Sequence, residues 1–217
     1  MDVIILAGGK GSRMENNLPK ALVLVKGKPI LALQLDYLLK SEKIDKIILA
    51  IGYQADKVIE YINSHYQSSP IDFSIEEEPL DTGGAVKKAL AKTKTDYVLV
   101  LNCDDITDID ISKLAEFKEN TICVAHPQLP FGRVTEKNGY ALFEEKPILD
   151  DWVNCGWYLF KKAELMSHLP DKGSLEYEVF PKIKLRLYKH QGFWKTLNTK
   201  KDIEEFEKID LPAALSF

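Results

Sequence analysis

The chain opens with a short apolar run, Asp2-Val3-Ile4-Ile5-Leu6, which leads directly into Ala7-Gly8-Gly9-Lys10-Gly11-Ser12-Arg13 and, a little later, Pro19-Lys20. The apolar run is rich in β-branched residues, which predicts a strand that ends where the glycines begin. The glycines let the backbone turn sharply and approach a ligand without a Cβ clash. Backbone N–H groups of such a loop can converge on phosphate oxygens, and Arg13 and Lys20 add positive charge. The stretch therefore predicts a polyphosphate site at the end of a strand.

The spacing differs from that of the two commonest phosphate loops. A Walker loop would place Gly-Lys-Ser/Thr four residues after its first glycine, and the dinucleotide fingerprint would need a glycine where Met14 stands. The stretch instead resembles the opening motif of the sugar-1-phosphate nucleotidyltransferases, Gly-Gly-x-Gly-Ser/Thr-Arg followed by Pro-Lys. The resemblance implies that Arg13 and Lys20 are catalytic. It also implies that the nucleotide is bound by Leu6, Ala7, Gly8, Gly9, Gly11, Ser12, Arg13 and Lys20.

The composition is that of a globular protein of ordinary character. Its 217 residues, 45% of them hydrophobic and 29% charged, suffice for one α/β domain with a substantial core. The net charge of -4 gives no general attraction to nucleic acid or to an anionic membrane, and we expect neither as a partner. Three cysteines without CxxC spacing are typical of a reducing compartment, and no signal peptide or membrane span is recognisable. We therefore expect a cytoplasmic protein.

Strand-like and helix-like segments alternate through the first half of the chain. Residues 46–50 and 97–101 are continuous apolar runs, which is typical of strands covered on both faces. Apolar residues recur at helical spacing over 30–39, 56–62 and 85–91. This alternation predicts an α/β fold, a Rossmann-like three-layer sandwich with a mostly parallel central sheet. The glycine loop and Asn102-Cys103-Asp104 both follow strands and should therefore share one edge of that sheet.

The second half of the chain has a mixed pattern. Strands are expected over 121–126, 140–145 and 155–160, and helices near 163–169 and 202–209. Because we find no repeat, low-complexity segment or linker, we predict a single nucleotidyltransferase domain over residues 1–217. Residues 1–120 would form its nucleotide-binding half, and residues 121–217 its sugar-phosphate-binding half, with a small mixed lobe for the acceptor.

A second nucleotide-binding loop is indicated by Glu78-Pro79-Leu80-Asp81-Thr82-Gly83-Gly84-Ala85, which resembles the family pattern Glu-Pro-Leu-Gly-Thr-Gly/Ala-Gly. The resemblance implies that Glu78, Thr82 and Gly83 contact the nucleotide. The glycines open a predicted helix, where backbone can pack flat against a base or ribose. Thr82 would also suit a helix cap, and Asp81 stands where the family commonly has Gly, which leaves the shape of this turn open.

Asp104 follows the strongest predicted strand, where the family places a metal-binding Asp, so the resemblance implies that Asp104 is a catalytic residue and a ligand of Mg²⁺. Asp105 is a competing candidate, and a carboxylate at a strand end can also satisfy backbone N–H groups. Many family members supply the second ligand from Trp-x-Asp-x-Gly-Thr, but here Thr196 takes the place of that Asp. The uridylyltransferases that act on N-acetylglucosamine 1-phosphate use Asn after Val, which Leu197-Asn198 resembles. Asn198 is therefore either a second Mg²⁺ ligand or the N-cap of a helix that starts near Lys200.

Three further matches concern the acceptor. Phe143-Glu144-Glu145-Lys146-Pro147 matches the family element Phe-x-Glu-Lys-Pro, in which Lys meets the sugar phosphate and Glu the sugar hydroxyls. Asn154-Cys155-Gly156-Trp157-Tyr158 resembles Asn-x-Gly-Ile-Tyr, and Ser174-Leu175-Glu176 resembles an element that presents a carboxylate to the sugar. The implied sugar-phosphate-binding residues are Glu145, Lys146, Asn154, Gly156 and Glu176.

Together the motifs resemble a compact sugar-1-phosphate nucleotidyltransferase of the mannose or heptose 1-phosphate guanylyltransferase type. The implied reaction joins an NTP and a sugar 1-phosphate into an NDP-sugar and pyrophosphate, and a homo-oligomer is left open. Glu78 could accept hydrogen bonds from guanine, yet uridylyl or cytidylyl transfer to another phosphorylated acceptor also remains open. Two other classes of protein remain open. One is a regulatory homologue that binds nucleotide-sugar without making it, which the replacement at Thr196 suggests. The other is a glycosyltransferase that binds its metal through Asp104-Asp105.

Overall fold

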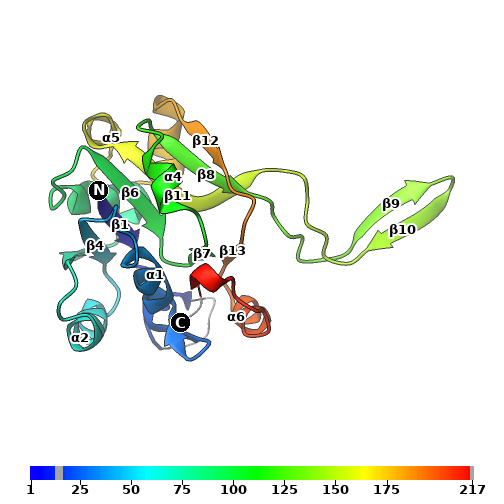
Figure 1. Ribbon diagram of the computed structural model, residues 1–217, viewed down its shortest axis with the longest axis horizontal. Helices are drawn as coiled ribbons and strands as arrows, with labels where there is room; N and C mark the ends of the chain where they lie inside the picture. The colour runs from blue at the N-terminus through cyan, green and yellow to red at the C-terminus, as the bar shows by residue number, and fades with distance from the viewer. Residues whose placement is uncertain (13–16, 216–217) are drawn as a thin grey trace.

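The computed structural model describes residues 1–12 and 17–215, and a seven-stranded sheet forms its centre (Figure 1). From edge to edge, the strands are β12 (Arg186–Lys189), β8 (Thr121–Ala125), β11 (Val153–Lys161), β6 (Tyr97–Asn102), β1 (Asp2–Leu6), β4 (Lys46–Ile51) and β5 (Ile71–Ile75). Strand β11 runs antiparallel to both of its neighbours, and all other adjacent pairs are parallel. The sheet is therefore mostly parallel, as predicted.

The central strands are buried on both faces because helices cover the sheet from both sides. Val3 and Ile5 of β1 pack into one apolar cluster, whereas Ile4 between them packs into another. The first cluster is completed by α1 (Ile30–Leu38), α2 (Ala55–His65), α4 (Ile111–Ala115) and α6 (Lys200–Phe206). The second is completed by α3 (Asp81–Leu90), α5 (Lys162–His168) and the π-helical turn η3 (Leu175–Val179). These three layers confirm the predicted α/β sandwich.

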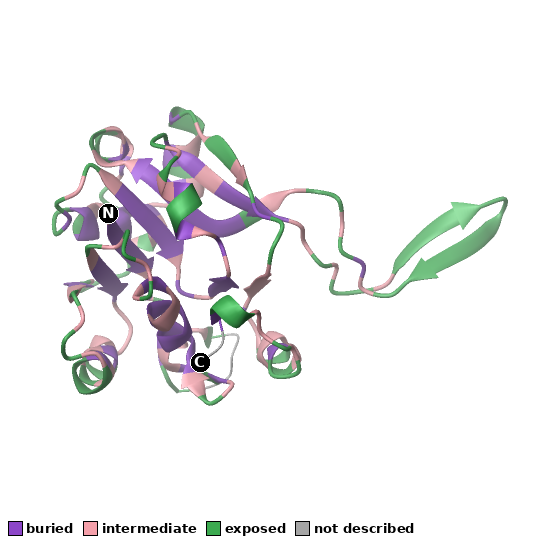
Figure 2. Cartoon of the chain, viewed as in Figure 1, coloured by how far each residue is buried: buried purple, intermediate pink, exposed green. Residues whose placement is uncertain are grey.

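Three small antiparallel pairs lie outside the main sheet. Strand β7 (Asp105–Thr107) pairs with β13 (Trp194–Thr196), and β2 (Leu24–Val25) pairs with β3 (Lys28–Pro29). The third pair, β9 (Arg133–Lys137) and β10 (Tyr140–Glu144), is a hairpin that projects away from the body and is exposed along both strands (Figures 1 and 2). Short 3-10 turns complete the chain: η2 (Lys20–Leu22), η4 (Phe180–Lys182) and η5 (Ala213–Leu215).

The second half of the chain contributes to the main sheet as well as to the smaller pairs. Strands β8, β11 and β12 extend the sheet built by the first half, so one sheet spans both halves. The division at residue 120 into a nucleotide half and an acceptor half stays a prediction. Within the described ranges, none of the helices combines the length and the apolar character that crossing a membrane requires.

Candidate active site

The glycine loop begins where β1 ends, between β4 and β6. Leu6 lies opposite Ala50 on one side and Asn102 on the other, so the carboxyl ends of all three strands meet at this edge. The loop then curls back on itself, since the Lys20 backbone N–H donates to the Gly9 carbonyl at 3.3 Å. Gly11 has φ +66°, a left-handed conformation that favours glycine, and a Cβ there would lie 3.0 Å from the Lys20 Cβ. The glycines thus allow Lys20 to return to the end of β1.

A pocket of about 680 Å³ opens at this edge of the sheet. It is lined by Leu6, Ala7, Gly8, Gly9, Lys10, Lys20, Ala21, Gly52, Tyr53, Glu76, Glu77, Glu78, Pro79, Asp81, Thr82, Ala85, Asn102, Cys103 and Asp104. Both predicted nucleotide loops and the strand end at Asp104 therefore meet around one cavity. Of the other predicted nucleotide-binding residues, Gly11 and Ser12 follow the lining part of the loop, and Arg13 lies outside the described residues.

The second loop keeps the shape that a glycine would give it. Asp81 adopts φ +60°, so it occupies the left-handed conformation at the position where the family commonly has Gly. Gly83 is not among the lining residues: its N–H donates to the Gly173 carbonyl at 2.7 Å, and a Cβ there would lie 2.8 Å from that oxygen. The role of Gly83 in the structure is therefore close packing of α3 against this segment.

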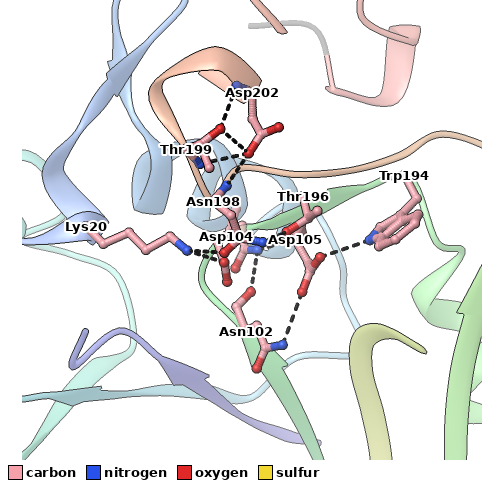
Figure 3. A network of polar contacts seen from close by, with 10 residues as sticks. Lys20, Asn102, Asp104, Asp105, Trp194, Thr196, Asn198, Thr199 and Asp202 are labelled. Atoms are coloured by element: carbon pink, nitrogen blue, oxygen red, sulfur yellow. Dashed lines mark hydrogen bonds and ion pairs between the residues drawn. The ribbon is translucent and has the colours of Figure 1, made fainter. Parts of the chain in front are cut away.

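Lys20, Asp104 and Asn198 converge on one point beside the pocket (Figure 3). The Lys20 ammonium donates a hydrogen bond to the Asp104 carboxylate and another to Asn198 Oδ1, the latter at 2.9 Å. The Lys20 and Asp104 side chains are each only 18% exposed. The three residues come from positions far apart in the sequence, and the fold brings two oxygens and one cation together.

Neighbouring residues fix the orientation of the Asn198 amide. Its Nδ2 donates to Thr196 Oγ1 at 2.9 Å, which leaves the carbonyl oxygen directed at Lys20. The N-cap of α6 is Thr199, which forms a capping box with Asp202. The alternative role of Asn198 as the helix cap is therefore wrong, and its side-chain oxygen accepts from the Lys20 ammonium instead of from the helix.

Asp105 turns away from the pocket, although it directly follows Asp104. Its carboxylate accepts hydrogen bonds from Asn102 Nδ2 at 3.1 Å and from Trp194 Nε1 at 3.0 Å. Burial and the nearby Asp104 charge raise the pKa of Asp105 well above its usual range. A Cβ at Gly156, which has φ +76°, would lie 2.0 Å from Asp105 Oδ2. Gly156 therefore makes room for Asp105, whose carboxylate is held by Asn102 and Trp194 outside the lining of the pocket.

The donor set is suited to Mg²⁺, which prefers carboxylate, amide, water and phosphate oxygens. Asp104 and Asn198 already share one cation, the Lys20 ammonium, so their oxygens lie close enough together for a second kind of cation. In residues 1–12 and 17–215, no group of three or more His, Cys, Asp or Glu side chains could hold a metal ion by itself. Two protein ligands would therefore need the oxygens of a bound nucleotide to complete the coordination.

Glu76 is a pocket residue that the sequence did not single out. It follows β5, and a Cβ at Gly8 would lie 2.8 Å from Glu76 Oε1, so the glycine loop and this carboxylate approach each other closely. Its other oxygen accepts a hydrogen bond from the Leu80 N–H at 3.2 Å, and burial raises its pKa. Glu78, the residue predicted from sequence, also lines the pocket but is exposed and pairs with Lys172 at 3.4 Å.

The predicted acceptor residues lie outside the pocket lining. Lys146 Nζ pairs with Glu205 of α6 at 2.9 Å, which raises the pKa of Lys146 and lowers that of Glu205. Glu205 lies six positions after Thr199, the N-cap at the other end of α6, which corresponds to about 9 Å along a helix. Helix α6 therefore connects the ion pair of Lys146 to Asn198, which immediately precedes the N-cap of the helix. The neighbouring Glu145 is exposed.

Two other acceptor residues are held in defined positions by hydrogen bonds. Asn154 donates to the Tyr158 hydroxyl at 2.7 Å and accepts from the Gly156 N–H at 3.0 Å. Glu176 accepts a hydrogen bond from Thr82 Oγ1 at 3.1 Å and thereby touches the lining of the pocket. Thr82 links the predicted acceptor carboxylate to the second nucleotide loop.

Comparison with known proteins agrees with this arrangement. The family model described as nucleotidyl transferase matches residues 2–178. The chain belongs to this family. A D-glycero-alpha-D-manno-heptose 1-phosphate guanylyltransferase of Aneurinibacillus thermoaerophilus is 34% identical over 195 residues, 84% of each chain. The protein of the same name from Campylobacter jejuni is 38% identical over 172 residues, 75% of this chain and 76% of its own.

A solved structure extends the likeness to the fold. HddC from Yersinia pseudotuberculosis, complexed with GMP-PN, matches this nucleotidyltransferase with a TM-score of 0.78 at 26% identity. The match covers 95% of this chain and 98% of HddC. The chain is therefore an enzyme of the nucleotidyltransferase class, and its pocket lies where the two predicted nucleotide loops meet.

Proposed function

We propose that this protein transfers a guanylyl group from GTP to a heptose or mannose 1-phosphate, forming GDP-sugar and pyrophosphate. The convergence of Lys20, Asp104 and Asn198 beside the pocket carries the proposal, because these residues could neutralise a reacting phosphate. The similarity to the two heptose 1-phosphate guanylyltransferases supports the choice of GTP and of the acceptor. We also place the enzyme in the cytoplasm.

The reaction asks little covalent chemistry of the protein. An oxygen of the sugar phosphate forms a bond to the α-phosphorus of the NTP, and the bond from that phosphorus to the pyrophosphate oxygen breaks. The nucleophile is already an anion, so catalysis depends on positioning and on charge neutralisation. Lys20 would neutralise the α-phosphate, while Arg13 and the N–H groups of the glycine loop would hold the departing pyrophosphate. The acidic lining of the pocket makes such cations necessary, since Glu76, Asp81 and Asp104 face the same cavity.

A bound Mg²⁺ would supply additional positive charge at the phosphates, held by Asp104 Oδ and Asn198 Oδ1. In the structure Lys20 lies against both oxygens, so it would have to turn toward the nucleotide when the ion binds. Thr196 would keep the Asn198 carbonyl oxygen directed at the ion through its hydrogen bond with Nδ2.

Glu76 would select the base. Guanine presents two adjacent donors, N1–H and the 2-amino group, and a carboxylate accepts both. Glu76 lies against Gly8 of the glycine loop, half-buried in the pocket, whereas Glu78 is exposed and paired with Lys172. We therefore assign base recognition to Glu76 and leave Glu78 at the rim of the site.

Glu76→Gln is expected to weaken GTP binding by roughly tenfold or more, because hydrogen bonds to a charged group contribute about 1.5–3 kcal/mol. Affinity for ITP, which lacks the 2-amino group, should fall less than affinity for GTP. Isothermal titration with GTP, ITP and UTP measures this directly, and Glu78→Gln is the matched control. Equal losses for GTP and ITP, or a larger loss in Glu78→Gln, would remove Glu76 from base selection.

The acceptor would be bound by Glu145, Lys146, Asn154, Gly156 and Glu176. Lys146 would anchor the sugar phosphate and would have to exchange its ion pair with Glu205 for the incoming phosphate. Asn154 and Glu176 would hydrogen-bond the uncharged sugar hydroxyls, and Gly156 would shape the site by its fit against Asp105.

Lys146→Ala should raise the KM for the sugar 1-phosphate, with nucleotide affinity almost unchanged, because it removes a contact to the acceptor alone. Steady-state kinetics with each substrate varied in turn would measure both effects. Lys195→Ala provides a control, since Lys195 pairs with the same Glu205 at 3.3 Å but is not assigned to the phosphate. A collapse of nucleotide affinity with unchanged acceptor KM would show that Lys146 serves the nucleotide instead.

A regulatory homologue that binds nucleotide-sugar without making it is the second candidate, because Thr196 replaces the family Asp. Release of pyrophosphate from GTP that depends on added sugar 1-phosphate separates the two functions. Failure of every NTP and sugar phosphate in a panel, despite nucleotide binding, would favour the regulatory role. Hydrolysis of a nucleotide-sugar without pyrophosphate would instead favour a glycosyltransferase.

A further inference from the structure

Apolar side chains of the β9–β10 hairpin are largely exposed to solvent. The two strands are joined by Asn138-Gly139, both with positive φ, the conformation of a tight hairpin turn. Tyr140 is 77% exposed and Phe143 is 68% exposed. Large aromatic side chains stabilise a fold or an interface mainly when they are buried. A two-stranded ribbon by itself is at best marginally stable in water, and three or more strands are needed for independent stability. Pairing with a further strand would therefore stabilise the hairpin.

The two outer edges of the hairpin differ in character. Strand β9 carries Arg133, Glu136 and Lys137, and such charges discourage pairing at an open edge. Strand β10 carries Tyr-Ala-Leu-Phe over residues 140–143, with its single charge at Glu144. In the described chain, the hairpin hydrogen-bonds to no strand outside itself. The edge of β10 is thus the one suited to accept a strand.

We propose that β10 pairs antiparallel with β10 of a second copy of this chain, around a two-fold axis at Leu142. The two hairpins would form one four-stranded sheet in the order β9, β10, β10, β9. Such an arrangement is isologous: each copy offers the same surface and receives the same surface in return.

The side chains on β10 are complementary to themselves in this register. Leu142 would lie opposite Leu142 of the second copy, and the small Ala141 opposite the large Phe143. Tyr140 would lie opposite Glu144, so no like charges face each other, and like charges opposite one another destabilise a sheet. The equivalent pairing of β9 about Thr135 would place Arg133 opposite Lys137, which disfavours that edge.

The area available fits a reversible dimer. Pairing edge to edge would cover part of Tyr140, Leu142 and Phe143 of each copy and would leave Val134, on β9, outside the interface. The area removed from water would therefore be smaller than the roughly 1,200–2,000 Å² of a standard specific interface, as in weak and transient associations. We therefore expect a dimer whose population rises with protein concentration. The proposal holds whether or not the enzyme transfers guanylyl groups, because it concerns a hairpin that projects from the body (Figure 1) and contributes no residue to the lining of the pocket.

Sedimentation velocity over a concentration series tests the pairing. We expect the unmodified protein to form dimers within roughly 1–100 µM, the range that a small interface of this kind supports. Leu142→Glu should be monomeric throughout, because it places two carboxylates opposite each other across the two-fold axis. Thr135→Glu is the matched control: Thr135 lies beside Leu142 on the hairpin but on the edge of β9, so this variant should still dimerise.

Mixing Leu142→Glu with Leu142→Lys should restore a dimer containing one copy of each, since opposite charges then face each other. Equal melting temperatures for all variants would confirm that the body of the protein remains folded. The proposal is overturned if the unmodified protein is monomeric at the highest concentration, if Leu142→Glu dimerises as before, or if Thr135→Glu disrupts the dimer equally. It is also overturned if the mixture of oppositely charged variants stays monomeric.

Discussion

Lys20→Ala is expected to lower kcat by about 10²–10³, with a much smaller change in nucleotide affinity, since a preorganised cation stabilises charge that develops in the transition state. In the structure Lys20 lies at the edge of the pocket, hydrogen-bonded to Asp104 and Asn198, and from there its ammonium could turn to a bound phosphate. Pyrophosphate release measured under saturating GTP and sugar 1-phosphate gives kcat, and titration of the variant with GTP gives its affinity.

Lys10→Ala separates this effect from the general loss of a positive charge. Lys10 also lines the pocket, but its ammonium lies over the ring of Tyr53, 5.5 Å from the ring centre, rather than at Asp104. An exposed cation contributes about 1 kcal/mol or less, so we expect a loss of no more than about tenfold. Near-normal turnover in Lys20→Ala would remove Lys20 from the mechanism. Equal losses of kcat in both variants would show that Lys20 acts only through its general positive charge.

The sequence predicted the centre of the fold better than its edges. Strands β1, β4 and β6 are continuous apolar runs because both of their faces are buried, and their bounds were predicted to within one residue. Strands β5 and β12 were missed. Their side chains are largely polar or half-exposed, and Arg186–Lys189 has a charge at each end, so no apolar run marks either strand. An edge strand is specified by the neighbour it pairs with, which a single sequence does not display.

In the site, the motifs predicted some of the residues that lie together, and the structure adds neighbouring residues that the motifs do not mark. Lys20, Asp104 and Asn198 converge as the spacing of the family motifs implies. Glu76 was missed because it is the first of three consecutive glutamates, and nothing in that run tells which carboxylate enters the pocket. Glu205 was missed because its partner Lys146 lies 59 residues away in the sequence. Such contacts depend on the path of the chain rather than on local pattern.

Asp104→Asn is expected to abolish turnover at ordinary Mg²⁺ concentrations. The substitution keeps the size of the side chain but removes the only carboxylate of the proposed ligand pair, and with it the charge that holds Lys20 and would hold a divalent ion. GTP binding measured with and without Mg²⁺ provides a readout besides activity: the enhancement by Mg²⁺ should be lost in the variant, while metal-free binding should persist. Undiminished enhancement by Mg²⁺ would exclude Asp104 as a ligand.

The second ligand gives an ordered series of variants. Asn198→Asp should retain turnover, because it keeps an oxygen at the same place and adds charge to the ligand pair. Asn198→Ala should be much less active, because the oxygen directed at Lys20 is lost. Helix α6 would not explain such a difference, since Thr199 and Asp202 form its capping box and Asn198 is not the cap. Equal melting temperatures with unequal Mg²⁺-dependent GTP binding would therefore identify Asn198 as a ligand. Equal activity of the two variants would exclude Asn198 as the second Mg²⁺ ligand.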